Sequence, residues 1–135
     1  MDRTQLLSLL PHQGSALWLD QILEHDTVGI QGLSAWSYLQ PFGPDASPCL
    51  LFEAAAQLCG AHGALYGGEK AIKTALVGKL NALHLHHEPT ERSGPLLISA
   101  RQEAVSPAGA LYAFRIHHHD RLLLDGRLLL VLVHA

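Results

Sequence analysis

The segment PCLLFEAAAQLCGAHGALY, residues 48–66, restricts the possible folds more than any other part of the sequence. Ser47 is a good N-cap, Pro48 suits a first helical turn, and a double glycine follows the segment. The pattern therefore predicts a helix from Pro48 to Tyr66. Its many alanines and glycines leave almost no face with bulky polar side chains. We therefore expect other elements to wrap this helix on most sides.

Strand-like segments precede the helix. After a short helical turn at residues 6–10, an extended run covers residues 16–23, and a second run at 27–38 ends with Trp36 and Tyr38 at alternating positions. Residues 39–48 contain three prolines and a glycine, so we expect a loop there.

Four more strand-like runs follow the helix, at residues 74–87, 96–104, 111–118 and 122–134. Turn signals accompany them at Ser93-Gly94-Pro95, Ser106-Pro107 and Asp125-Gly126. The predicted order is two strands, one buried helix and four strands. This order indicates an α+β domain in which a curved antiparallel sheet wraps one long central helix, which is the hotdog fold.

Composition bears on domain number and assembly. The 135 residues fit a single domain, residues 1–135. With 48% hydrophobic and only 16% charged residues, the chain has few charged side chains to cover its surface. We therefore expect a second subunit to cover part of its apolar surface.

Charge and hydropathy exclude several partners. The formal net charge of −3 provides no positive field for nucleic acid or anionic lipid, and no apolar run is long enough to span a membrane. The first residues lack the apolar run and cleavage site of a secretory leader. Cys49 and Cys59 match no disulfide or zinc spacing, so we expect a cytoplasmic protein.

Glu53 is the first candidate for chemistry. It lies in the first turns of the predicted helix among apolar residues, where it could serve as a general acid or base. It could equally well only complement the positive end of the helix dipole. Gln57 follows one turn later on the same face, so the two side chains can form a hydrogen bond.

Three stretches resemble the FabZ and FabA type 3-hydroxyacyl-acyl-carrier-protein dehydratases. LLPHQGSALWLDQIL at 9–23 is similar to their entry segment, and LLFEAAAQLCGAHG at 50–63 is similar to their central helix. LLLDGRLLLVLVHA at 122–135 resembles their closing hairpin, with Asp125-Gly126 as the turn.

The resemblance implies a dimer with acyl tunnels at the subunit boundary. In that family a helix carboxylate of one subunit and a loop histidine of the other remove water from the thioester. The carboxylate corresponds to Glu53. The histidine has no counterpart: counting back without gaps places it at Leu39, and residues 37–48 contain no histidine.

Other groups would then have to assist Glu53. The polar candidates are Gln57, Asp45 and Ser47, together with His12 and His62 from elsewhere in the chain. The family's oxyanion glycine is replaced by Pro48, which has no amide hydrogen, so the Cys49 amide becomes the candidate donor. These departures resemble the divergent dehydratase-like proteins of aryl-polyene and related lipid pathways.

Two histidine clusters suggest a metal site at first sight. They are His84, His86 and His87, and His117, His118 and His119. Four imidazoles could converge if the two strands were neighbours, but no Asp, Glu or Cys has ligand-like spacing beside them. We therefore expect no metal and no redox cofactor.

The leading functional prediction is a dehydratase-like lyase that acts on 3-hydroxyacyl thioesters, carried by an acyl carrier protein or by CoA. The expected assembly is a homodimer, or a heteromer with a related hotdog subunit. The alternatives are a non-catalytic acyl-binding or partner subunit and an acyl thioesterase.

Overall fold

A computed structural model describes residues 1–10, 16–67 and 72–134. Its elements run in the order α1 (Arg3–Leu9), β1 (Gln21–His25), β2 (Gly29–Ala35), the 3-10 helices η2 (Trp36–Phe42) and η3 (Pro48–Leu51), α2 (Phe52–Tyr66), β3 (Ile72–Leu85), β4 (Pro95–Ser106), β5 (Gly109–His118) and β6 (Arg121–His134). The predicted order of two strands, a long helix and four strands along the chain is confirmed.

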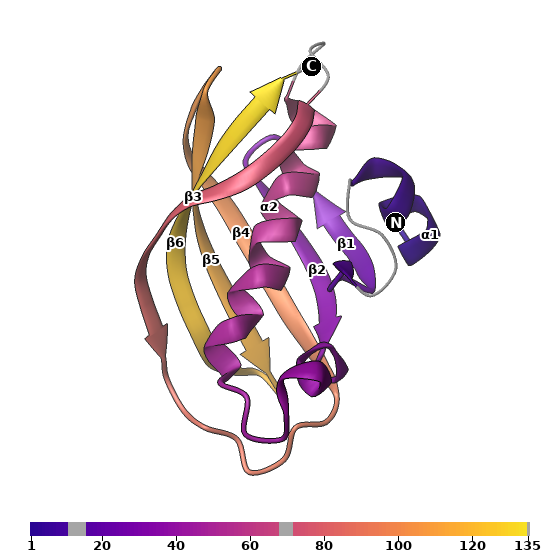
Figure 1. Cartoon of the computed structure of the whole chain (residues 1–135), viewed down its shortest axis with the longest axis vertical. Coiled ribbons are helices and arrows are strands. Elements are labelled where there is room, and N and C mark those ends of the chain that lie inside the picture. The colour runs from indigo at the N-terminus through magenta and orange to yellow at the C-terminus, as the bar shows by residue number, and fades with distance from the viewer. Residues whose placement is uncertain (11–15, 68–71, 135) are drawn as a thin grey trace.

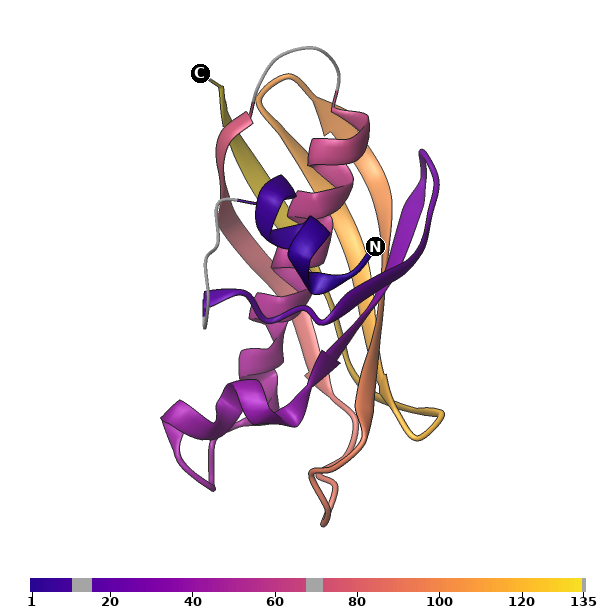
Figure 2. The same ribbon diagram turned by 90° about the vertical axis from the view of Figure 1, so that its right-hand side faces the viewer.

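The strands form one antiparallel six-stranded sheet in the order β1-β2-β4-β5-β6-β3. They curve around α2, which lies against one face of the sheet (Figure 1). A view turned by 90° shows α1 in front of α2 (Figure 2), and the two helices are in contact. β1 and β3 are the two edge strands.

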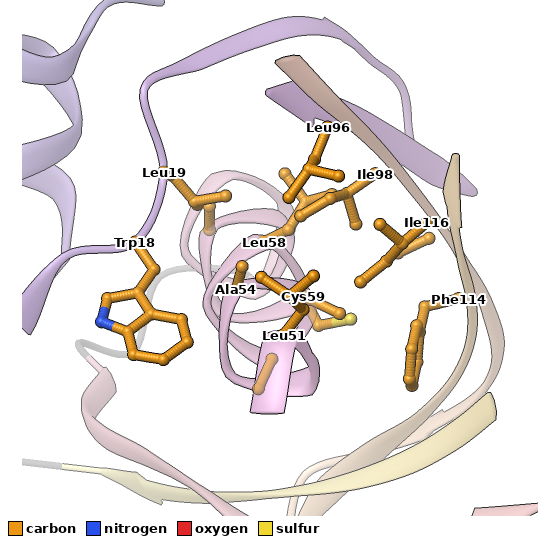
Figure 3. Packing of buried hydrophobic residues seen from close by; sticks show 14 of the residues in the cluster. Trp18, Leu19, Leu51, Ala54, Leu58, Cys59, Leu96, Ile98, Phe114 and Ile116 are labelled. Atoms are coloured by element: carbon orange, nitrogen blue, oxygen red, sulfur yellow. The ribbon is translucent and has the colours of Figure 1, made fainter. Parts of the chain in front are cut away.

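The core lies between α2 and the sheet. Ala54, Leu58 and Cys59 are fully buried on the helix, and the sheet contributes buried residues that include Ile98 and Phe114. Figure 3 shows these sheet residues on one side of α2, with Trp18 and Leu19 on the other side. The small residues of α2 therefore allow close packing on several faces, as its composition predicts.

The segment 36–42 differs from the prediction. Trp36 and Tyr38 are not in a strand, because β2 ends at Ala35 and η2 begins at Trp36. Trp36 turns inward and packs its indole edge-on against the ring of His118, with 5.2 Å between the centroids. Burial of this indole outweighs the two-residue alternation that suggested a longer strand.

The prediction of a turn at Asp125-Gly126 is wrong. Both residues lie inside β6, where Asp125 is opposite Arg115 of β5. The β5–β6 turn instead uses His119 and Asp120, with φ of 50° and 63°. Gly126 serves packing: a β-carbon there would lie 3.1 Å from the Phe114 ring.

Two element boundaries also differ. Residues 48–51 form the 3-10 helix η3, and the α-helix begins only at Phe52. The first strand covers 21–25 rather than 16–23, because the backbone of residues 16–19 is held by side chains instead of a neighbouring strand.

Candidate functional site

The candidate site lies at the end of the molecule where α2 begins. The η2–η3 segment, the β3–β4 connection and the β5–β6 turn all lie at this end (Figure 1). Glu53 is in the first turn of α2 and is half-buried.

Gln57 fixes the position of the Glu53 carboxylate. Its Nε2 donates to Glu53 Oε1 over 3.2 Å, as the spacing of one helical turn predicts. Gln57 itself is only 2% exposed. The same Nε2 donates to the carbonyl of Ala16 over 2.7 Å, and Gln57 Oε1 accepts from the Trp18 amide over 2.7 Å. Because every polar atom of the side chain is engaged, the carboxylate contacts a rigid neighbour.

The extended segment 16–19 is held from its other side as well. Ser34 Oγ donates to the carbonyl of Trp18 over 2.6 Å. Arg3 Nη1, from α1, donates to the carbonyls of Leu17 and Leu19 over 3.0 and 2.8 Å. α1 and β2 therefore clamp the segment that carries the partners of Gln57.

Tyr38 connects this clamp to η2. Its hydroxyl donates to Asp20 and accepts from Arg3 Nη1 over 2.8 Å, and its ring stacks on Trp18 with 6.2 Å between centroids. Burial and the Asp20 hydrogen bond raise the pKa of Tyr38 to about 12. The hydroxyl therefore stays protonated at neutral pH. Asp20 lies in the stretch 9–23 that resembles the family's entry segment, whereas nothing in the sequence pointed to a role for Tyr38 or Arg3 at this site.

The candidates near the start of α2 are mostly engaged with one another. Ser47 Oγ accepts from the Cys49 amide over 3.1 Å, as an N-cap does. Any other acceptor would have to displace Ser47 Oγ from the Cys49 amide. Asp45 is exposed in the connection before η3.

His62 is buried and makes hydrogen bonds within the core of the fold. It is fully buried, its Nε2 donates to the carbonyl of Asp26 over 2.9 Å, and its Nδ1 lies 2.7 Å from the Tyr112 hydroxyl. It also lies nine residues after Glu53, which places it roughly 13 Å farther along the helix axis. Both ring nitrogens are used, so His62 has no free nitrogen with which to assist Glu53.

The remaining histidines do not converge. His12 falls outside the described residues. β3, which contains His84, is separated by β6 from β5, which contains His117. His86 follows β3 directly and contacts Asp125 over 3.1 Å. Within the described part of the chain, no three His, Cys, Asp or Glu side chains are grouped so that they could hold a metal ion.

Four hollows of about 400 to 640 Å³ open on the surface of the described residues, and Glu53 lines none of these four. Two of them lie at the α2 start, where both are lined by Trp36, Ser37 and Arg92. Sequence reasoning missed Arg92, because it lies in an irregular connection that matches no motif.

Cys49 and Cys59 are both free thiols, and burial raises the pKa of Cys59. Among the helices of the described ranges, none is long and apolar enough to cross a membrane.

Comparison with models of known protein families and with curated protein sequences finds no match. Several solved structures are similar. The dehydratase heterocomplex ApeI:P from Xenorhabdus doucetiae superposes with a TM-score of 0.83 at 16% identity, over 95% of this chain and 90% of that chain. A mutant of the thioesterase PA1618 from Pseudomonas aeruginosa gives a TM-score of 0.70 at 17% identity, over 100% and 96%.

A hypothetical thioesterase with coenzyme A from Streptococcus pneumoniae gives a TM-score of 0.60 at 11% identity, over 95% of this chain and 91% of that chain. At such identities the likeness concerns the fold. The order of strands, the buried helix and these superpositions together show that the chain has the α+β hotdog fold, with dehydratase and thioesterase structures among its neighbours.

Proposed function

We propose that this chain is a subunit of a 3-hydroxyacyl-thioester dehydratase, with Glu53 as its acid-base group. The observation that carries the proposal is the Glu53–Gln57 pair at the start of a wrapped helix. A half-buried carboxylate held by a rigid amide is positioned for proton transfer, and the amide groups of the helix start favour negative charge on a nearby thioester oxygen.

The reaction needs no redox step. Glu53 accepts the proton from C2 of the 3-hydroxyacyl thioester, and the electron pair of that C–H bond forms the C2–C3 double bond. The C3–O bond breaks as the hydroxyl takes up this proton from Glu53, so water leaves and the carboxylate is regenerated. The thioester carbonyl acidifies the C2–H bond, because it accepts part of the developing charge.

A non-catalytic or partner subunit is the second candidate. Residues 37–48 lack the histidine of the FabZ and FabA pattern, and the Cys49 amide is already bonded to Ser47. A dehydratase heterocomplex is also among the structural neighbours. A related subunit that supplies a histidine opposite Glu53 would complete the acid-base pair.

Thioester hydrolysis is the third candidate, favoured by the thioesterases among the structural neighbours. In this case Glu53 would activate a water that attacks the thioester carbonyl, and the C–S bond would break to release a thiol and an acid. The products separate the candidates: dehydration leaves the thioester intact.

The test incubates the purified chain with a 3-hydroxyacyl-pantetheine thioester and follows both the enoyl product and the free thiol. We expect enoyl product, and a fall of about 10² to 10⁴ in rate for Glu53→Gln. Glu24→Gln makes the same change on the exposed part of β1 and should leave the rate unchanged.

The outcomes of this experiment distinguish the three candidate functions. Free thiol in place of enoyl product would establish hydrolysis instead. Acyl binding without turnover, with activity only after a histidine-bearing hotdog subunit is added, would establish the partner-subunit role. Equal rates for Glu53→Gln and the unmodified chain would exclude Glu53 as the acid-base group.

A further inference from the structure

The indole of Trp36 contains a buried donor that has no partner. Trp36 is only 6% exposed, and its Nε1 makes no hydrogen bond with any atom of the described residues. A buried indole N–H usually has an acceptor, and leaving it without one lowers the stability of the fold. An acceptor from outside the described chain would satisfy it.

Arg92 lies over the same indole. Its guanidinium carbon is 5.4 Å from the Trp36 ring centroid, in a cation–π contact. No carboxylate of the described residues forms a salt bridge with Arg92, in contrast to Arg127, which pairs with Glu103 over 2.7 Å. The guanidinium is therefore held in place by an aromatic face, while its fork of donors is available to a ligand.

The surroundings of Arg92 are hollow on two sides. One hollow of about 480 Å³ is lined by Leu39, Gly43 and Pro44, and another of about 400 Å³ by Asp20, Leu33 and Pro95. Trp36, Ser37 and Arg92 belong to both. A ligand group at Arg92 would thus have space on either side.

The connection that carries Arg92 is anchored. His118, only 4% exposed, donates from Nε2 to the carbonyl of Ser93 over 2.6 Å, and its ring packs against Trp36. A β-carbon at Gly94 would lie 2.9 Å from the His119 ring, so the backbone approaches the β5–β6 turn closely. These contacts fix the backbone directly after Arg92, which reduces the entropy lost when a ligand binds.

We propose that Arg92 and Trp36 form a phosphate-binding site for the phosphopantetheine arm of the thioester substrate. The inference rests on the proposed thioester function and adds to it the part of the substrate that is recognised. Guanidinium groups bind phosphate through two parallel hydrogen bonds. The indole N–H is enclosed in the structure, so a phosphate oxygen reaches it only when a lining side chain turns aside.

The position of the site fits an arm that enters from outside. Both hollows lie at the end of the molecule where α2 begins, the end that holds Glu53. The thioester carbonyl must lie near Glu53 for the proposed reaction, and the arm then extends away from it toward solvent. A phosphate at the outer end of the arm would then lie at Arg92, which is half-buried.

The experiment compares two ligands by calorimetry, the 3-hydroxyoctanoyl thioesters of pantetheine and of 4′-phosphopantetheine. We expect the phosphorylated ligand to bind the unmodified chain about tenfold to a hundredfold more tightly. Arg92→Gln should bring the ratio of the two dissociation constants close to one. Arg92→Lys keeps the charge but not the forked pair of donors, and it should leave a ratio between one and that of the unmodified chain. Arg101→Gln removes the same charge on the outer sheet face and should preserve the full ratio.

Each outcome separates the inference from the function on which it rests. Equal binding of the two thioesters to the unmodified chain would overturn the phosphate site and leave thioester binding intact. Loss of the ratio in Arg101→Gln but not in Arg92→Gln would also overturn it. Binding of neither thioester would overturn both proposals. Inorganic phosphate that binds as tightly as the phosphorylated thioester would show a free-phosphate site instead.

Discussion

The side-chain amide of Gln57 joins three parts of the chain: the Glu53 carboxylate, the carbonyl of Ala16 and the amide of Trp18. We expect Gln57→Leu to lower the free energy of unfolding by about 1 to 3 kcal/mol, because it leaves the buried Trp18 N–H without an acceptor. Urea denaturation monitored by circular dichroism measures the change. Gln21→Leu, at an exposed position of β1, should alter the free energy far less, and equal losses in both variants would contradict this role.

Glu53 and Gln57 could be predicted as a pair, because helical spacing places them on one face. The other partners of Gln57 could not. Trp18 lies 39 residues away and Ala16 lies 41 residues away in the sequence, so no local pattern connects them to the helix. The same holds for Arg3 and Tyr38, which meet over 35 residues.

At the level of secondary-structure elements, two glycines have opposite roles. A β-carbon at Gly32 of β2 would lie 2.9 Å from the carbonyl oxygen of Gln21 and 2.9 Å from a methyl group of Leu58. At Gly60 of α2 the nearest atom would be a methyl group of Leu10 at 3.9 Å, an ordinary contact.

We therefore expect Gly32→Ala to destabilise the fold by about 1 to 3 kcal/mol, because a backbone oxygen has to move. Gly60→Ala should stabilise it by about 0.5 to 1 kcal/mol, because alanine loses less conformational entropy in a helix. Thermal unfolding of the two variants measures both effects. A stabilising Gly32→Ala would mean that β1, β2 and α2 do not approach as closely as described.

The complete fold leaves β3 as a long edge strand of 14 residues, while the opposite edge, β1, has only five. A long unpaired edge is a template for pairing with another chain. Val77 on β3 is 37% exposed, which is high for an apolar residue beside a core. We expect a second copy of the chain, or a related subunit, to cover this edge.

If the edge is covered by a second copy, sedimentation equilibrium should give twice the 14.6 kDa mass of one chain. Val77→Asp should shift the population toward the monomer, because it places a charge at a desolvated contact. Val105→Asp makes the same change at a 66% exposed position of β4 and should leave the mass unchanged. A monomeric unmodified chain would contradict self-association and leave only the heteromeric arrangement.

The buried helix, the order of helices and strands along the chain, and the position of Glu53 follow from local sequence. Residue periodicity and backbone preferences act over only a few neighbouring residues. Long-range packing decided the rest. Asp125-Gly126 favours a turn locally, but sheet register placed it inside β6, where the glycine makes room for Phe114. Trp36 fits a strand locally, yet burial against His118 turned it inward and brought it under Arg92. Such contacts depend on how distant segments align, and alignment is settled only when the whole sheet closes around the helix.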